Sequence, residues 1–191
     1  MTRSIYVVGG AGSGKSTFMA DLIPFPLNSH LVDLHSLRNA KALVTLRGHE
    51  FEGGIYLGKM RDEHPGTDGL DRASHRTGID WLERGMHEEY DMLLGEGFTL
   101  GTRDFLFALG TYTDLLLVHL HVSEEKRLER FVERGTSQSP QFVKSTVSAA
   151  RNRYEELRNY SKTVSVDTED PDAWEIALEI CGEHLESKDF L

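Results

Sequence analysis

The residues with the clearest chemical potential form a glycine-rich run near the start of the chain. The run reads Gly9-Gly10-Ala11-Gly12-Ser13-Gly14-Lys15-Ser16 and is followed by Thr17. It matches the spacing G-x-x-x-x-G-K-[ST] at every fixed position. Glycines allow a tight turn that points several backbone N–H groups at one anion, and the helix that begins there adds the positive end of its dipole. The Lys15 ammonium can reach the β- and γ-phosphates, and the Ser16 hydroxyl can ligate Mg²⁺. The run predicts a P-loop that binds ATP and Mg²⁺.

A cation on these phosphates also needs a carboxylate at the end of a neighbouring strand. Glu96 follows the apolar run 92–95 and is the preferred candidate for a metal ligand. Asp33 follows Leu31-Val32 and is a second candidate. Both residues also fit a solvated acid at a strand end.

The long polar segment 58–76 offers a carboxylate for the acceptor side of a phosphoryl transfer. It contains Gly66-Thr67-Asp68-Gly69-Leu70-Asp71. Such a transfer needs a general base that takes the proton of the acceptor hydroxyl. Asp68 lies between glycines and could be held in that position, although the same residues also suit an ordinary turn. Asp33, Asp68 and Asp71 all stay open as the base.

Arginines follow the apolar segment 115–122. Arg127, Arg130 and Arg134 share one face of an expected helix. We expect residues 124–144 to form a lid, with Arg130 and Arg134 stabilising charge on the transferred phosphoryl group. The alternative is a solvated helix with salt bridges to neighbouring glutamates.

The overall charge limits the possible partners. Lys plus Arg is 21 and Asp plus Glu is 31, so the net charge is −10, which excludes a broad basic coat for nucleic acid. Lys144, Arg151 and Arg158 recur every seven residues and could follow a phosphate backbone. Glu155 and Glu156 lie among them, so a mixed-charge face is equally open.

Short apolar runs alternate with amphipathic segments, which predicts an α/β fold. We expect one domain over residues 1–191, with a mainly parallel five-stranded sheet, helices on both faces, a small lid and an inserted hairpin. The hairpin and the catalytic loop span about 41–76, with strands 41–46 and 51–57 flanking Arg47-Gly48-His49. The remaining expected strands are 4–8, 31–33, 91–96, 115–122 and 163–166.

Helix starts are marked by capping residues. Thr77 and Asp80 have capping-box spacing, and apolar residues continue at helical intervals to Leu93. Further helices are expected after Ser123, Ser139-Pro140 and Asp170-Pro171. In this topology adenine should lie near residues 167–171, at the carboxyl ends of the strands.

The composition bounds the location and the redox chemistry. No segment approaches the roughly 20 apolar residues of a membrane helix. The N-terminus lacks the shape of a signal peptide, so a cytoplasmic protein is expected. Cys181 is the single cysteine and is expected in the core. His119 and His121 alternate on one strand face and are interpreted as packing residues. No stable protein partner is indicated.

Together these motifs resemble the P-loop kinases of nucleosides and nucleotides, and more closely the phage 5-hydroxymethyluridine DNA kinases. The similar pieces, in family order, are Tyr56-Leu57-Gly58-Lys59 with Arg61, Pro65-Gly66-Thr67-Asp68 with Leu70, Glu96-Gly97 with Leu100-Gly101, Leu117-Val118-His119-Leu120, Arg130 with Arg134-Gly135, and Gln138 with Val143-Lys144. The basic run expected after Lys144 is diluted to Ser145-Thr146, and the hairpin over 41–57 is long.

The resemblance implies transfer of the γ-phosphoryl group of ATP to the 5-hydroxymethyl group of uracil in DNA. It implies that Asp68 is the base, that Lys15 and Ser16 serve ATP and Mg²⁺, that Arg130 and Arg134 belong to the lid, and that Glu96 lies at the metal or the acceptor. The residues expected to contact the acceptor are Lys59, Arg61, Thr67, Asp71 and Lys144. A phage protein of this kind would act in the host cytoplasm.

Two other functions remain open. The first is a kinase of a free (deoxy)nucleoside or nucleotide, similar to thymidylate kinase. This function agrees better with an acidic surface, because the protein would not have to bind a DNA polyanion. The second is an NTP-dependent binding module without an acceptor, which would need neither Asp68 nor a substrate pocket.

Overall fold

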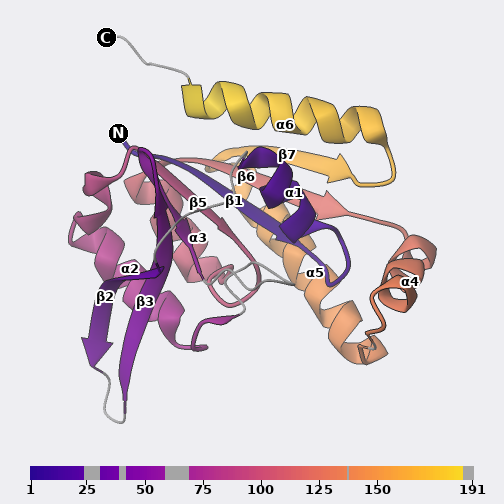
Figure 1. Ribbon diagram of the computed structural model, residues 1–191, viewed down its shortest axis with the longest axis horizontal. Coiled ribbons are helices and arrows are strands. Elements are labelled where there is room, and N and C mark those ends of the chain that lie inside the picture. Colours follow the sequence, from indigo (N-terminus) through magenta and orange to yellow (C-terminus); the bar gives the residue numbers. More distant parts are fainter. Residues whose placement is uncertain (24–30, 39–41, 59–68, 137, 187–191) are drawn as a thin grey trace.

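The computed structural model describes residues 1–23, 31–38, 42–58, 69–136 and 138–186 (Figure 1). Its centre is a seven-stranded sheet in the order β2-β3-β4-β5-β1-β6-β7. The strands are β1 (Arg3–Gly9), β2 (Leu31–Arg38), β3 (Leu43–Phe51), β4 (Gly54–Leu57), β5 (Met92–Glu96), β6 (Asp114–His121) and β7 (Lys162–Asp167).

The prediction of a five-stranded sheet was wrong in the number of strands. The pairs β4–β5, β5–β1, β1–β6 and β6–β7 are parallel. The antiparallel strands β2 and β3 extend this parallel part on one side. The carboxyl ends of β5, β1, β6 and β7 therefore meet at one edge of the sheet, where ligands of parallel α/β sheets bind.

The expected hairpin turn at Arg47-Gly48-His49 was also wrong. These residues lie inside β3, and the connection to β4 is made by Glu52 and Gly53. Gly48 serves close packing and not a turn, because a Cβ at this position would lie 2.8 Å from the Ile55 side chain and 2.8 Å from the Tyr56 carbonyl oxygen. The second strand, expected over 31–33, runs on to Arg38.

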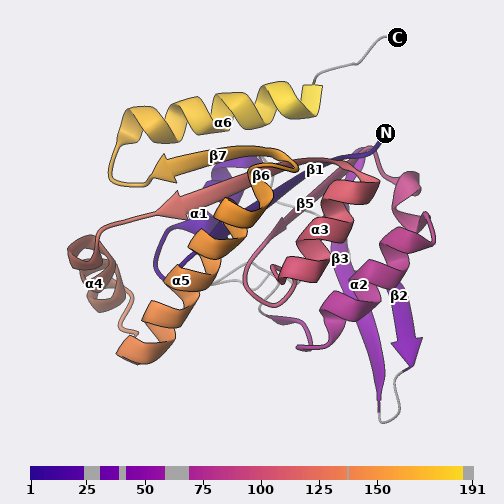
Figure 2. The same ribbon diagram turned by 180° about the vertical axis from the view of Figure 1, so that it is seen from behind.

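Helices cover both faces of the sheet, as expected. The helices α1 (Lys15–Leu22) and α6 (Pro171–Glu186) pack on one face, where Ile5, Val7 and the buried Cys181 belong to one core cluster. The helices α2 (Ser74–Glu83), α3 (Arg103–Tyr112) and α5 (Pro140–Leu157) cover the other face and stand in front of the sheet in Figure 2. The helix α4 (Glu124–Glu133) projects beyond the carboxyl end of β6 (Figure 1).

Two helical predictions needed correction. The helix expected to run from Thr77 to Leu93 begins at Ser74 and ends at Glu83, and a 3₁₀ helix (Met86–Glu89) and β5 follow. Gly85, in the left-handed conformation at φ 70°, separates the two helices. The helix α3 was not predicted; its N-cap is Thr102, whose hydroxyl accepts the N–H of Phe105.

The other predicted caps are confirmed. Ser123 caps α4, and Ser139 caps α5 with proline in its first turn. Within the part of the chain that the structure describes, no helix combines the length and the apolar character needed to cross a bilayer.

Candidate active site

The glycine-rich run forms the loop between β1 and α1. Gly12 and Gly14 have φ values of 78° and 91°, in the left-handed region that favours glycine. Gly14 is the N-cap residue of α1, so the positive end of this helix points into the loop. A Cβ at Gly9 would lie 2.3 Å from the Ser13 hydroxyl and 2.8 Å from the Leu120 carbonyl oxygen. The local geometry therefore depends on glycine at these positions.

The polar groups in this loop suit a chain of phosphates. The Lys15 ammonium folds over the loop and donates to the carbonyl oxygens of Gly9 at 3.0 Å and Gly10 at 3.2 Å. The Ser13 side chain is 1% exposed, and its hydroxyl has no hydrogen-bond partner among the described residues. A buried hydroxyl of this kind is costly unless a ligand or water completes it. The cradle thus fits a nucleoside triphosphate.

Glu96 lies at the carboxyl end of β5, beside the strand that leads into the P-loop. It pairs in register with Val7 of β1 and is 2% exposed. The Tyr56 hydroxyl donates to its Oε1 atom at 3.5 Å. The described residues contain no group of three or more His, Cys, Asp or Glu side chains that could hold a metal alone. A cation near Ser16 and Glu96 would therefore take its other ligands from phosphates and water, as Mg²⁺ commonly does.

Asp33 is not brought to this site. It lies on β2, and β3, β4 and β5 separate that strand from β1. Its Oδ1 atom accepts a hydrogen bond from Arg47 Nε at 2.7 Å on an exposed surface.

Arg130 connects α4 to the P-loop. Its Nη1 atom donates to the Gly12 carbonyl oxygen at 3.1 Å and to the Thr168 hydroxyl at 3.0 Å, and its Nη2 atom donates to the Thr168 carbonyl oxygen at 3.2 Å. Arg134 caps the exposed C-terminal end of α4. Of the two predicted lid arginines, Arg130 is therefore the one in contact with the phosphate site.

The loop after β7 is brought to the P-loop by the same contacts, through Thr168. Trp174 of α6 lies beside the P-loop: a Cβ built on Gly14 would be 3.6 Å from its indole ring. The indole N–H donates to Asp21 at 3.1 Å, and the ring packs edge-on against Phe18. Helical periodicity marks Trp174 only as part of an apolar face, so its position next to the P-loop could not be predicted from that pattern.

Thr146 of α5 is a second residue that the sequence did not indicate. Its hydroxyl accepts the N–H of Ala11 at 3.1 Å and itself donates to the Val143 carbonyl oxygen at 2.9 Å. Lys144 lies on the same turn and is exposed. Further along α5, Arg158 forms an ion pair with Glu155 at 3.2 Å, so the basic line along this helix is partly neutralised.

Most of the expected acceptor residues fall where the structure gives no description. Lys59, Arg61, Thr67 and Asp68 lie outside the described residues. Asp71 is described, and its Oδ1 atom accepts the N–H of Ala73 at 2.8 Å, just before α2. This bond gives Asp71 a role in starting the helix.

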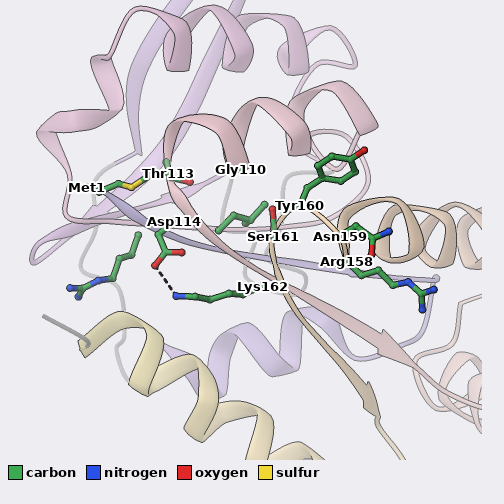
Figure 3. Close-up of a pocket in the computed structure, with 11 residues that line it drawn as sticks. Met1, Gly110, Thr113, Asp114, Arg158, Asn159, Tyr160, Ser161 and Lys162 are labelled. Carbon is green, nitrogen blue, oxygen red and sulfur yellow. Dashed lines mark hydrogen bonds and ion pairs between the residues drawn. The ribbon is translucent and has the colours of Figure 1, made fainter. Parts of the chain in front are cut away.

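A cavity of about 910 Å³ lies at the opposite edge of the sheet, where β6 and β7 begin (Figure 3). The cations in its lining are bonded to the protein itself. Lys162 forms an ion pair with Asp114 at 3.0 Å, drawn in Figure 3, Arg158 pairs with Glu155, and Arg3 donates to the Leu185 carbonyl oxygen. This cavity is remote from the P-loop and is not the nucleotide site.

Solved structures with a similar fold include kinases. A sugar kinase from a Janibacter species has a TM-score of 0.51 and 18% identity, with 95% of each chain covered. An uncharacterised protein from Eubacterium ventriosum has a TM-score of 0.51 and 11% identity, over 98% of this chain and 100% of that one. Deoxyadenosine kinase from M. mycoides gives a TM-score of 0.46 and 13% identity, over 94% of this chain and 99% of that one. At these identities the likeness concerns the fold.

No curated protein matches the chain by sequence. A family model described as P-loop Nucleotide Kinase3 matches residues 1–181, which include the P-loop, Glu96, α4 and Trp174. The chain therefore belongs to this family of P-loop nucleotide kinases.

Proposed function

We propose that the chain is an ATP-dependent phosphotransferase whose acceptor is the 5-hydroxymethyl group of 5-hydroxymethyluracil in DNA. The observation that carries the phosphotransferase part is the contact between Arg130 and Gly12, which holds a guanidinium against a P-loop that already carries the Lys15 ammonium. The choice of acceptor is supported by the resemblance to the phage kinases. The similar motifs run from Tyr56-Leu57-Gly58-Lys59 to Val143-Lys144 and follow one another in the family's order.

The step balances as a direct displacement. The acceptor hydroxyl oxygen forms a bond to the γ-phosphorus while the bond from that phosphorus to the β–γ bridging oxygen breaks. The hydroxyl proton passes to the Asp68 carboxylate, and ADP leaves with the bridging oxygen. Lys15 and Arg130 offset the negative charge on the phosphoryl oxygens. When bound, Mg²⁺ would neutralise the β- and γ-phosphates, and Ser16 and Glu96 are the protein groups that would hold it.

The DNA acceptor has to reach an acidic protein. The net charge of −10 disfavours strong DNA affinity, so contact would rely on local cations such as Lys59, Arg61 and Lys144. The modified base would have to leave the stack or be single-stranded before it enters a pocket. Turnover on DNA should therefore fall as the salt concentration rises.

The direct test is transfer of labelled γ-phosphate from ATP. The acceptors are one oligonucleotide with 5-hydroxymethyluracil, offered single-stranded and as a duplex, the same oligonucleotide with thymine, and the free 5-hydroxymethyl deoxynucleoside and its monophosphate. Label on the modified oligonucleotide alone supports the proposal. Label on the free compounds but not on DNA rejects DNA as the acceptor, while the proposed kinase activity still stands. ATP hydrolysis without any labelled acceptor favours the NTP-dependent binding module.

The base is tested with matched aspartate variants. We expect Asp68→Asn to lower transfer at least roughly 10²-fold while ATP binding is retained. Asp71→Asn is the control, because asparagine keeps a side-chain oxygen for the Ala73 N–H and hence the start of α2. A large loss in Asp71→Asn with none in Asp68→Asn would assign the base to Asp71.

The second candidate function is a kinase of free nucleotides, and it is favoured by the distribution of charge on α5. Arg158 pairs with Glu155, which shortens the cationic line along α5 that a DNA backbone could follow. If free nucleotides are the acceptors, turnover should depend little on salt.

A further inference from the structure

A second cavity, of about 300 Å³, lies on the α5 side of the P-loop. It is bounded by Gly10, by the end of β6 and by α5. Val118 and Leu120 of β6 pack in the core beneath α1 and α6, so the alternating residues His119 and His121 project to the opposite face, under α5. The Trp174 ring lies toward the face of the sheet that α1 and α6 cover, and so do the hydrogen bonds between Arg130 and Thr168. The cavity is therefore separate from the nucleotide side of the loop.

One wall of the cavity carries a buried cation that lacks part of its hydrogen bonding. Arg127 is 7% exposed, and its Nη2 atom donates to the Val122 carbonyl oxygen at 3.1 Å. Its Nε–H is buried and has no partner among the described residues. Burial lowers the pKa of the Arg127 guanidinium, which still stays protonated at neutral pH. The guanidinium therefore adds a positive charge to the wall of the cavity.

The facing wall, on α5, adds a second cation and an aromatic surface. Arg151, Tyr154 and Glu155 line this side. Tyr154 stacks on His119 with ring centroids 5.2 Å apart and an interplanar angle of 24°. Burial, with smaller contributions from His121 and Arg151, lowers the pKa of His119 to about 4. At neutral pH the His119 ring is uncharged and forms a flat wall beside two guanidinium groups.

These features define the chemistry of a ligand. Two arginines against one glutamate leave an excess of positive charge in the lining, which suits an oxyanion. The volume is at the lower end of small-molecule sites, so it admits an oxyanion together with a small organic group.

We propose that this cavity is a second ligand site, for a small phosphorylated compound whose phosphoryl oxygens accept hydrogen bonds from Arg127 and Arg151. The ligand offsets the positive charge of the two guanidinium groups and places its organic group along the stacked rings of His119 and Tyr154. This site goes beyond the proposed phosphoryl transfer, because none of its chemistry requires an acceptor or a γ-phosphate.

The site is mechanically connected to the P-loop. A Cβ at Gly10 would lie 2.5 Å from a methyl carbon of Val147, and the N–H of Ala11 donates to Thr146 at 3.1 Å. A ligand that fixes α5 at the cavity therefore also acts on the backbone that binds ATP. We expect it to change the affinity for ATP by about 5- to 150-fold, the usual range of coupling between two sites.

The test follows the imidazole NMR signals of His119 and His121 in the full chain. The probes, at millimolar concentrations, are inorganic phosphate, glycerol 3-phosphate and thymidine 5′-monophosphate, with thymidine as the probe that lacks a phosphoryl group. Saturable shifts with the phosphorylated probes and none with thymidine are expected. Equal affinity for inorganic phosphate and for the esters would identify free phosphate as the source of the oxyanion. Shifts with thymidine alone, or no saturable shift with any probe, overturn the proposal.

Variants separate this cavity from the P-loop, which also binds phosphate. Arg151→Gln, at an exposed position on α5, should weaken binding by roughly tenfold or more, as expected for loss of a charged hydrogen bond. Lys126→Gln is the matched control, since Lys126 neighbours Arg127 but pairs with Glu129 at 2.7 Å outside the cavity. Lys15→Met should abolish ATP binding and leave the histidine shifts intact. Shifts that survive Arg151→Gln, or that vanish with Lys15→Met, contradict a separate site, and neither result bears on the acceptor of the kinase.

Discussion

The Nη1 atom of Arg130 donates to the carbonyl oxygen of Gly12, 118 residues earlier in the chain, at 3.1 Å. This hydrogen bond links α4 to the P-loop, and the bonds from Arg130 to Thr168 extend the link to the loop after β7. In the proposed phosphoryl transfer, a guanidinium held in this way would need little reorganisation during the reaction.

Replacing Arg130 should therefore impair phosphoryl transfer strongly. Arg130→Met is expected to lower kcat by about 10²- to 10³-fold, because a preorganised charged donor is removed. Arg134→Met should have a smaller effect, since Arg134 stands at the exposed end of α4. Both variants are compared by labelled-phosphate transfer, with Arg84→Met as the control for an exposed arginine paired with Asp80. Equal losses in Arg130→Met and Arg134→Met would contradict this assignment.

Glu96 should govern the response to magnesium. Glu96→Gln removes the buried charge beside β1 and is expected to raise the Mg²⁺ concentration needed for half-maximal turnover at least about tenfold. The measurement is a Mg²⁺ titration at saturating ATP, with Glu125→Gln on α4 as the control. An unchanged titration together with reduced thermal stability would mean that Glu96 has a structural role, to which its hydrogen bond with Tyr56 contributes, and is not a metal ligand.

Alanine substitutions at two glycines with left-handed backbone distinguish the cost of steric conflict from the cost of backbone strain. A Cβ at Gly12 would lie 2.9 Å from Arg127 Cγ and 3.0 Å from the Phe131 ring, whereas a Cβ at Gly135 would meet no described atom within 4 Å. Gly135→Ala should reduce the free energy of unfolding by about 1–2 kcal/mol, the cost of the left-handed conformation. Gly12→Ala should cost about 1–3 kcal/mol more, because the Cβ overpacks α4, and should also weaken ATP binding. Chemical denaturation measures both values, and equal losses would count against close packing of Gly12 on α4.

Acid should destabilise the protein through His119. Its pKa is lowered from 6.5 to about 4 in the folded chain, chiefly by burial, so the unfolded chain binds this proton at higher pH than the folded chain does. The free energy of unfolding should then decrease as the pH falls from about 6.5 to about 4, by at most about 1.4 kcal/mol per pH unit for one proton. Solvent access to the ring reduces this value.

Thermal unfolding across this pH interval tests the assignment. His119→Gln should flatten the pH dependence, and His75→Gln, at a partly exposed position on α2, should leave it as it is. If the stability of His119→Gln depends on pH as strongly as that of the unsubstituted protein, His119 is not the responsible group. His184, whose pKa is also lowered by burial, is then the next candidate.

The P-loop could be predicted from sequence because its geometry is local. The turn depends on glycines within residues 9–14, and the charge of Lys15 and the hydroxyl of Ser16 follow directly in the chain. The caps Ser123 and Ser139 were predictable for the same reason, since an N-cap bonds to N–H groups within the next turn. Helices on both faces also followed from the alternation of apolar and amphipathic segments.

The choice between Glu96 and Asp33 depended on the tertiary structure. Both acids follow short apolar runs, and sequence pattern cannot rank them. The pairing of β5 with β1 places Glu96 beside the P-loop, while β2 pairs with β3 and lies at the far side of the sheet that the described residues form. Strand order is set by hydrogen bonds between segments distant in sequence, which local propensity does not encode.

What the amino-acid sequence determined by itself is thus the phosphate cradle and the starts of several helices, where neighbouring residues satisfy one another's backbone groups. Only the tertiary structure brought Arg130, Thr146 and Trp174 to that cradle and placed Arg127 in the wall of a second cavity. These contacts arise when helices pack on the sheet, and their energies come from burial and long-range hydrogen bonds.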